Sequence, residues 1–168
     1  FSPWRALELA KIDKLLDVCS TFLFQVESNA YNIFSQENRR RLAQIEELGL
    51  HIGLHFYVPS LEANDWQELG AALKRQADLL SQVTHAEITR FSYHRPPKWV
   101  LVNRSNYVGD YLNLYGGSFF EYSGNPQNIK YIADSRHRYD YGHPLDEYSF
   151  TKFHLLFHPD EWASEGLD

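Results

Sequence analysis

The chain has 168 residues, of which 43% are apolar and 23% are charged, and its formal net charge is −6. This length fits one compact domain but is short for a complete eight-stranded α/β barrel, which usually needs about 250 residues. The composition excludes an intrinsically disordered chain. Because the chain is acidic and lacks clustered Lys or Arg, it has no electrostatic footprint for a phosphate backbone, and we expect no nucleic-acid partner.

The cysteine content and the lack of long apolar segments indicate in which cellular compartment the protein is expected. Its single cysteine, Cys19, can form no disulfide within the chain, and its apolar neighbours predict a small buried core residue. No run of 18 apolar residues appears, and residues 1–10 lack the order of a signal peptide. We therefore expect a soluble, cytoplasmic protein without a membrane span.

Apolar residues at helical spacing predict three helices in the first half of the chain, over residues 2–17, before Gly49 and over 61–83. Short apolar runs predict five strands, at residues 21–26, 51–55, 87–93, 129–133 and 153–157. Between residues 96 and 124 the sequence is rich in Tyr, Asn and Gly, which predicts long loops with short strands. Helices that alternate with apolar strands are typical of a parallel sheet, so we expect an α/β fold.

Ionisable residues follow four of the predicted strands. In parallel α/β folds the reactive side chains come from the carboxyl ends of strands, because the loops there converge on one face. One strand ends in His55, the next in His94 and Arg95, and the last two in Asp134 and His158. A single histidine at a strand end is more often structural, but four such ends together predict an active centre.

Four segments in this order resemble the motifs of the polysaccharide deacetylases, a superfamily of carbohydrate esterases. They are GLHIGLHF (49–56), FSYHRPPKW (91–99), YIADS (131–135) and LLFHPDEW (155–162). The resemblance is nearest to a divergent branch associated with bacterial surface-polysaccharide gene clusters. It implies a single domain over residues 1–168 with a distorted, incomplete (β/α) barrel, whose first strand would lie upstream of residue 1.

The resemblance also implies roles for individual residues. His55 matches a ligand of one divalent metal, expected to be zinc, which activates water against an acetamido carbonyl. Arg95 matches a residue that orients a catalytic carboxylate, and Asp134 matches an aspartate that supports the catalytic groups through hydrogen bonds. His158 matches the general acid that protonates the leaving amine. His94 is a further candidate metal ligand, with a supporting hydrogen-bond donor as the equal alternative.

The sequence departs from this pattern at the metal site. The second metal histidine of the family would lie four residues after His55, where this chain has Pro59, and the aspartate ligand and the base would come from the upstream strand. Three functions therefore stay open. The first is a metal-dependent N-deacetylase of an acetamido sugar in a bacterial surface polysaccharide, and the second is a non-catalytic relative that binds a glycan or a partner. Hydrolysis of another small amide is a third. Tyr31, Asn32 and Trp162 are the predicted contacts to a carbohydrate.

Overall fold

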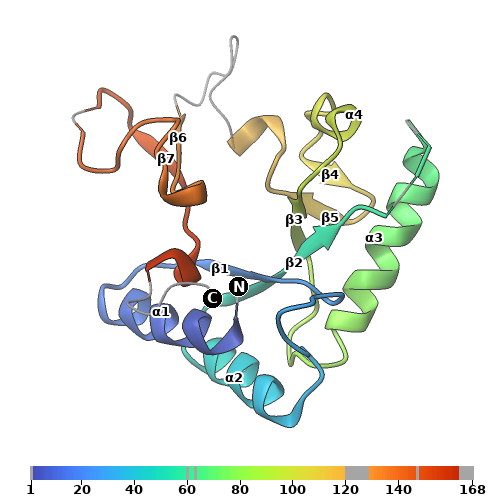
Figure 1. Cartoon of the computed structure of the whole chain (residues 1–168), viewed down its shortest axis with the longest axis horizontal. Coiled ribbons are helices and arrows are strands. Elements are labelled where there is room, and N and C mark those ends of the chain that lie inside the picture. Colours follow the sequence, from blue (N-terminus) through green and yellow to red (C-terminus); the bar gives the residue numbers. More distant parts are fainter. Residues whose placement is uncertain (1, 60, 63, 120–128, 147, 163–168) are drawn as a thin grey trace.

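The computed structural model of the chain describes residues 2–59, 61–62, 64–119, 129–146 and 148–162 (Figure 1). Its mixed α/β fold contains a five-stranded sheet in the order β1-β2-β3-β5-β4 and a two-stranded parallel sheet of β6 and β7. The elements are α1 (Pro3–Leu15), β1 (Thr21–Phe24), α2 (Gln36–Glu47), β2 (His51–Tyr57), α3 (Trp66–Leu80), β3 (Arg90–His94), α4 (Lys98–Leu101), β4 (Tyr107–Val108), β5 (Tyr111–Asn113), η1 (Gly117–Phe119), β6 (Ile129–Ala133), η2 (Ser135–His137), β7 (Lys152–Leu156) and η3 (Pro159–Trp162). The predicted α/β class is confirmed, and within the described residues neither sheet closes into a barrel.

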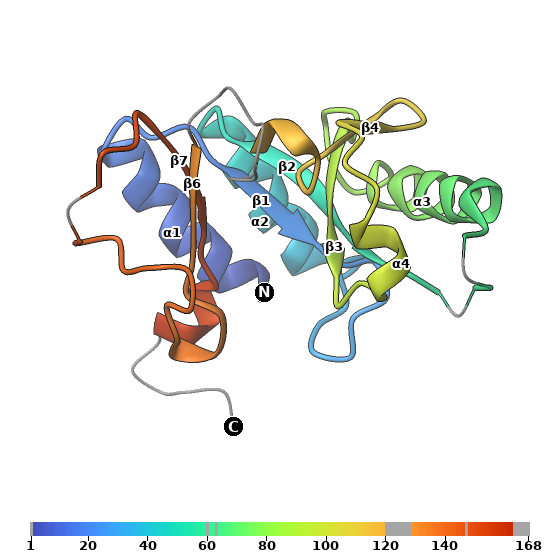
Figure 2. The ribbon, with the colours of Figure 1, turned by 90° about the horizontal axis from the view of Figure 1, so that it is seen from above.

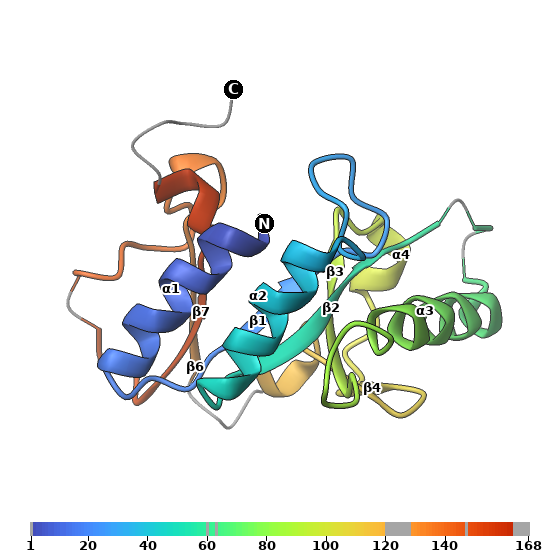
Figure 3. The ribbon, with the colours of Figure 1, turned by 90° about the horizontal axis from the view of Figure 1, so that it is seen from below.

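Two strand–helix–strand units build the parallel part of the larger sheet. β1 pairs with β2 and β2 with β3, all in parallel, and α2 and α3 are the connecting helices. Figure 3 shows α1, α2 and α3 on the same face of this sheet. Alternate strand residues point to that face and form a core with the helices. Its fully buried members include Phe24, Leu54, Phe56, Phe91, Leu42, Ile45, Leu69, Leu73 and Leu80.

The opposite face of the same strands is shaped by Gly53. In the parallel register Gly53 lies beside Leu23 of β1. A Cβ atom on Gly53 would lie 2.8 Å from Leu23 Cδ2 and 3.0 Å from the carbonyl oxygen of Arg90, so this close approach requires glycine. The Arg90 guanidinium crosses the same place and donates from Nη1 to Thr21 Oγ1 at 3.3 Å. Arg90 thus covers this face of the sheet at Gly53. His55 lies on the same face of β2, two residues after Gly53.

The second sheet is joined to the first at the carboxyl ends of the strands. Ser2, at the amino end of α1, donates from its backbone N and its Oγ to the two carboxylate oxygens of Asp160, at 2.9 and 2.7 Å. Asp160 follows β7, and its charge also acts on Tyr31, which follows β1. The carboxyl ends of β1 and β7 therefore lie at one edge of the molecule, although the β6–β7 pair stands apart from the larger sheet (Figures 1 and 2).

Several predicted details differ from the structure. The first helix ends at Leu15 rather than Asp17, and the third spans Trp66–Leu80 rather than 61–83. Cys19 was predicted to be buried but is exposed, because the turn after α1 places it at the surface. The fourth strand, 129–133, is confirmed residue for residue. No helix among the described residues is long and apolar enough to cross a membrane.

Candidate active site at the carboxyl ends of the strands

Asp134 and His158 form a pair held by two hydrogen bonds. The Nδ1 atom of His158 lies 2.6 Å from Oδ1 of Asp134, and the backbone N of His158 donates to Oδ2 at 2.8 Å. Asp134 is 1% exposed, whereas the His158 side chain keeps 27% of its surface. They are adjacent because β6 and β7 are parallel and in register up to Ala133 and Leu156, so each follows the end of its strand. A buried carboxylate thus orients a more accessible imidazole.

His55 and His94 form a second pair, on the larger sheet. Their rings meet edge to face with centroids 4.8 Å apart. They belong to β2 and β3, where His55 is paired with Ser92 and His94 lies two residues beyond Ser92. Burial lowers the pKa of His55 to about 3, and the charge of His94 contributes to this lowering, so the His55 imidazole is neutral at neutral pH. Burial, followed by the charge of Arg95, also lowers the pKa of His94.

The two pairs lie within electrostatic reach of each other. A positive charge on His158 is among the influences that lower the pKa of His55. His55 lies two residues before the end of β2, and His158 lies two residues after the end of β7. The carboxyl ends of strands are where parallel α/β folds place their ligands. The expectation that these residues form one active centre stays a prediction. Their chemical roles stay predictions.

Arg95 is placed differently. It is exposed and forms no hydrogen bond or ion pair with another described residue. Its backbone is left-handed, with φ of 47°, a conformation that costs free energy in residues other than glycine. The chain turns sharply here, from β3 into Pro96 and Pro97 before α4. The predicted role of Arg95 in orienting a carboxylate stays a prediction, because the structure shows no carboxylate beside it among the described residues.

The described residues do not complete a metal site. A neutral imidazole offers the nitrogen lone pair that zinc requires, so His55 and His94 suit two coordination positions. Both carboxylate oxygens of Asp134 are engaged by His158. In the part of the chain that the structure describes, no three His, Cys, Asp or Glu side chains are grouped so as to hold a metal ion. Zinc binding would need a further ligand.

The loop after β1 carries two of the predicted carbohydrate contacts. Tyr31 accepts a hydrogen bond at its hydroxyl from the backbone N of Gln25 at 2.9 Å, and burial raises its pKa to about 12. Asn32 is exposed, and its backbone carbonyl oxygen accepts a hydrogen bond from Asn38 Nδ2 at 2.8 Å. Residues 26–32 surround a surface hollow of about 400 Å³. The third predicted contact, Trp162, ends η3, and its side chain lies outside the described set.

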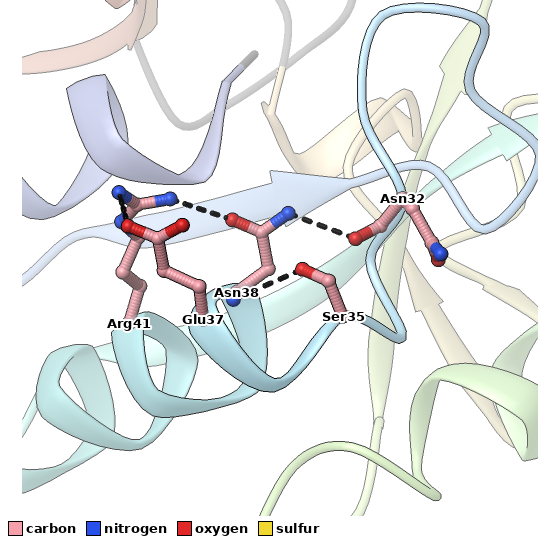
Figure 4. Close-up of polar contacts among 5 residues, drawn as sticks. All are labelled: Asn32, Ser35, Glu37, Asn38 and Arg41. Atoms are coloured by element: carbon pink, nitrogen blue, oxygen red, sulfur yellow. Dashed lines mark hydrogen bonds and ion pairs between the residues drawn. The ribbon is translucent and has the colours of Figure 1, made fainter.

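A polar network at the start of α2 fixes this loop (Figure 4). Ser35 Oγ accepts from the backbone N of Asn38 at 3.3 Å, which caps the helix. The buried Asn38 side chain also accepts from Arg41 Nη1 at 2.9 Å, and Arg41 pairs with Glu37 one helical turn earlier. The network holds the carbonyl of Asn32, and through it the loop beside the site, against a helix that belongs to the core.

His154 was not among the site residues predicted from the sequence. It lies in β7 with Nδ1 2.8 Å from the carbonyl oxygen of Phe119, to which it donates, and its ring centroid lies 5.2 Å from that of Tyr131. Burial lowers the pKa of His154 and raises that of Tyr131. Both line a cavity of about 630 Å³. The alternation of side chains along β7 could have revealed this residue. His154 lies four positions before His158, so an extended chain places both side chains on the same face.

The fold and the site define an α/β protein with a carboxylate-oriented histidine at the carboxyl ends of its strands. No protein-family model matches the chain, and no curated protein sequence matches it. Among solved structures it is similar to the crystal structure of a mutant protein described as a CE4 family pseudoenzyme, with 19% identity and a TM-score of 0.42. The match covers 55% of this chain and 32% of that one. A likeness this distant establishes neither a family nor an activity.

Proposed function

We propose that the protein is a hydrolase that removes the acetyl group from an acetamido sugar, with His158 as the group that transfers the proton. The observation that carries this proposal is the buried Asp134 carboxylate, which accepts hydrogen bonds from the backbone N of His158 and from its ring nitrogen Nδ1. The motif resemblance supplies the substrate class, a bacterial surface polysaccharide or its precursor.

Amide hydrolysis requires that a proton reach the departing nitrogen, because an amine anion is a poor leaving group. An ionised carboxylate can only accept hydrogen bonds, so Asp134 fixes the proton of His158 on Nδ1. Proton exchange with the substrate is thereby assigned to the other ring nitrogen, Nε2. Such a positioned acid typically contributes about 10²–10⁴-fold to a rate. The neutral His55 imidazole can accept a hydrogen bond from a water or hydroxyl on the same edge.

Zinc is part of the proposal as a Lewis acid that would polarise the acetamido carbonyl and activate water. His55 and His94 would supply two ligands, and the remainder would have to come from residues outside the described set. Isothermal titration with zinc tests this directly. Binding that is lost in His55→Gln but kept in His85→Gln, a change in an exposed loop, would support the ligand assignment.

Acetate release from an N-acetylated chitooligosaccharide, with and without zinc, tests the activity. The Asp134→Asn variant keeps the shape of the carboxylate but can present an N–H to His158, so we expect acetate release to fall by about 10²-fold or more. Asp140→Asn is the matched control, since Asp140 is exposed and pairs with the exposed Arg138 in its own loop. Equal rates in all three proteins would contradict the assignment of His158.

A second candidate function rests on Pro59, which stands where the resembled family has its second metal histidine. A relative that binds a glycan without hydrolysing it would tolerate this change. This second function predicts that the chitooligosaccharide binds, shifts the NMR resonances of the site residues and is recovered unchanged. The hydrolase proposal instead predicts release of acetate.

A further inference from the structure

The first residues of the three parallel strands form a polar group at the amino-terminal edge of the larger sheet. β1 begins at Thr21, β2 at His51 and β3 at Arg90. Thr21 and His51 are direct partners in the parallel register, so their side chains lie on the same face. Arg90 Nη1 donates to Thr21 Oγ1 at 3.3 Å, which brings the guanidinium to the same place. A hydroxyl, an imidazole and a guanidinium therefore meet at this edge.

The Arg90 guanidinium lacks a counter-charge. Arg90 is partly buried, and it forms no ion pair with any residue that the structure describes. Taking a permanent charge out of water without an anionic partner is unfavourable. Burial, followed by the charge of Arg90, lowers the pKa of His51, so the two side chains lie within electrostatic reach of each other. Because a guanidinium carries several N–H groups, donors remain here for an anion.

Gly53 makes room for the aliphatic part of Arg90. A Cβ atom at this third position of β2 would lie 3.1 Å from Cγ of Arg90. Glycine weakens the interior of a strand and often marks a place that a ligand or another chain segment approaches closely. The missing side chain lets the stem of Arg90 lie across β2, with its charged end near Thr21. The packing of the stem thus sets the position of the guanidinium.

We propose that this edge binds a phosphate group, with Arg90 as the main binding residue and Thr21 and His51 as further hydrogen-bonding partners. A guanidinium presents two parallel N–H groups that match two oxygens of a phosphate or a carboxylate. Phosphate has a third terminal oxygen, which remains for donors from the neighbouring strands, whereas a carboxylate has none. The inference does not depend on the proposed hydrolase activity, because the candidate active site lies at the opposite ends of the strands.

Titration of the full chain with sodium phosphate tests the proposal, with the amide NMR resonances of Thr21 and His51 as the readout. We expect a saturable shift. Arg90→Met removes the charge and both parallel N–H groups, so binding should weaken by roughly tenfold or more. His51→Gln should weaken it by about fivefold. Arg75→Met is the matched control, because Arg75 pairs with Glu68 on the surface of α3, and it should leave phosphate binding unchanged.

Thermal unfolding distinguishes a binding role of Arg90 from a purely structural one. Methionine keeps much of the length of the arginine stem without its charge. In phosphate-free buffer Arg90→Met should therefore unfold at the same or a higher temperature than the unaltered protein. Phosphate should raise the unfolding temperature of the unaltered protein and of Arg75→Met, but not that of Arg90→Met. Glycerol phosphate, if it binds more tightly than inorganic phosphate, would identify the group as part of a larger molecule.

Three results would overturn the proposal. The first is an equal shift with sodium chloride at the same ionic strength, and the second is tighter binding of acetate than of phosphate. The third is unchanged phosphate affinity in Arg90→Met or, if that variant does not fold, in His51→Gln, which alters an exposed side chain. None of these readouts involves release of acetate from a sugar, so failure here is distinguishable from failure of the proposed function.

Discussion

The two sheets differ in how well they are packed, and the site takes one histidine-containing pair from each. β1, β2 and β3 are covered by helices and contain buried runs of residues. β7 has no buried residue, and its Phe153 and Leu155 are 47% and 48% exposed. His55 and His94 therefore lie on a well-packed sheet, whereas the Asp134–His158 pair lies on a poorly covered one. Stability and function should respond differently to changes in the two regions.

The largest expected effect contrasts a leucine from each region. Leu54→Ala in β2 removes a fully buried side chain and should lower the free energy of unfolding by about 2–5 kcal/mol. Leu155→Ala in β7 should cost less than about 1 kcal/mol, because half of that side chain already contacts water. Urea unfolding measures both free energies, and similar losses in the two variants would contradict the difference in packing between the two sheets.

A smaller effect is expected where β1 and β3 approach each other. Gly53→Ala places a methyl group 2.8 Å from Leu23 Cδ2, so we expect a loss of about 1–3 kcal/mol. Gly70→Ala lies inside α3, where the added methyl group meets no atom within 4 Å beyond its chain neighbours and the nearby backbone of the helix, so it should instead gain about 0.5–1 kcal/mol. Thermal unfolding of the pair checks the sign of each change, and a stabilised Gly53→Ala protein would contradict the packing.

His55 should make the stability depend on pH. Its pKa is about 3 in the folded protein, against 6.5 for an unperturbed histidine, so between these values the unfolded chain binds a proton that the folded chain excludes. Its contribution is constant above pH 6.5, and below it the free energy of unfolding falls by up to about 1.4 kcal/mol per pH unit. Chemical unfolding from about pH 7 to pH 4 should show a shallower decline in His55→Gln. Parallel curves would mean that His55 is not buried as described.

The smallest effect concerns the loop that carries Tyr31. Ser35→Ala removes the cap of α2 and should cost about 1 kcal/mol. Exchange at the amides of residues 26–34 should rise relative to the rest of the protein, because the network around Asn38 anchors this loop. The equivalent change at the cap of α3, Asp65→Ala, should have a similar cost in stability but leave exchange in residues 26–34 unaltered.

The strands could be predicted because they depend on local patterns of apolar residues. Apolar runs identified β6 to the residue, and polar side chains directly after such runs identified His55, Asp134 and His158. What could not be predicted depends on packing between distant segments. One example is the exposure of Cys19, which follows the turn after α1. Another is the hydrogen bond between His154 and Phe119, because these residues lie 35 positions apart in the sequence.

In our proposal the ends of both sheets form one site, and NMR mapping with an N-acetylated chitooligosaccharide tests whether they do. We predict that resonances of His55 and His94, on the larger sheet, and of Asp134 and His158, on the smaller one, shift together with a single apparent Kd. Shifts confined to one sheet, or two separate Kd values for the two sheets, would contradict a shared site.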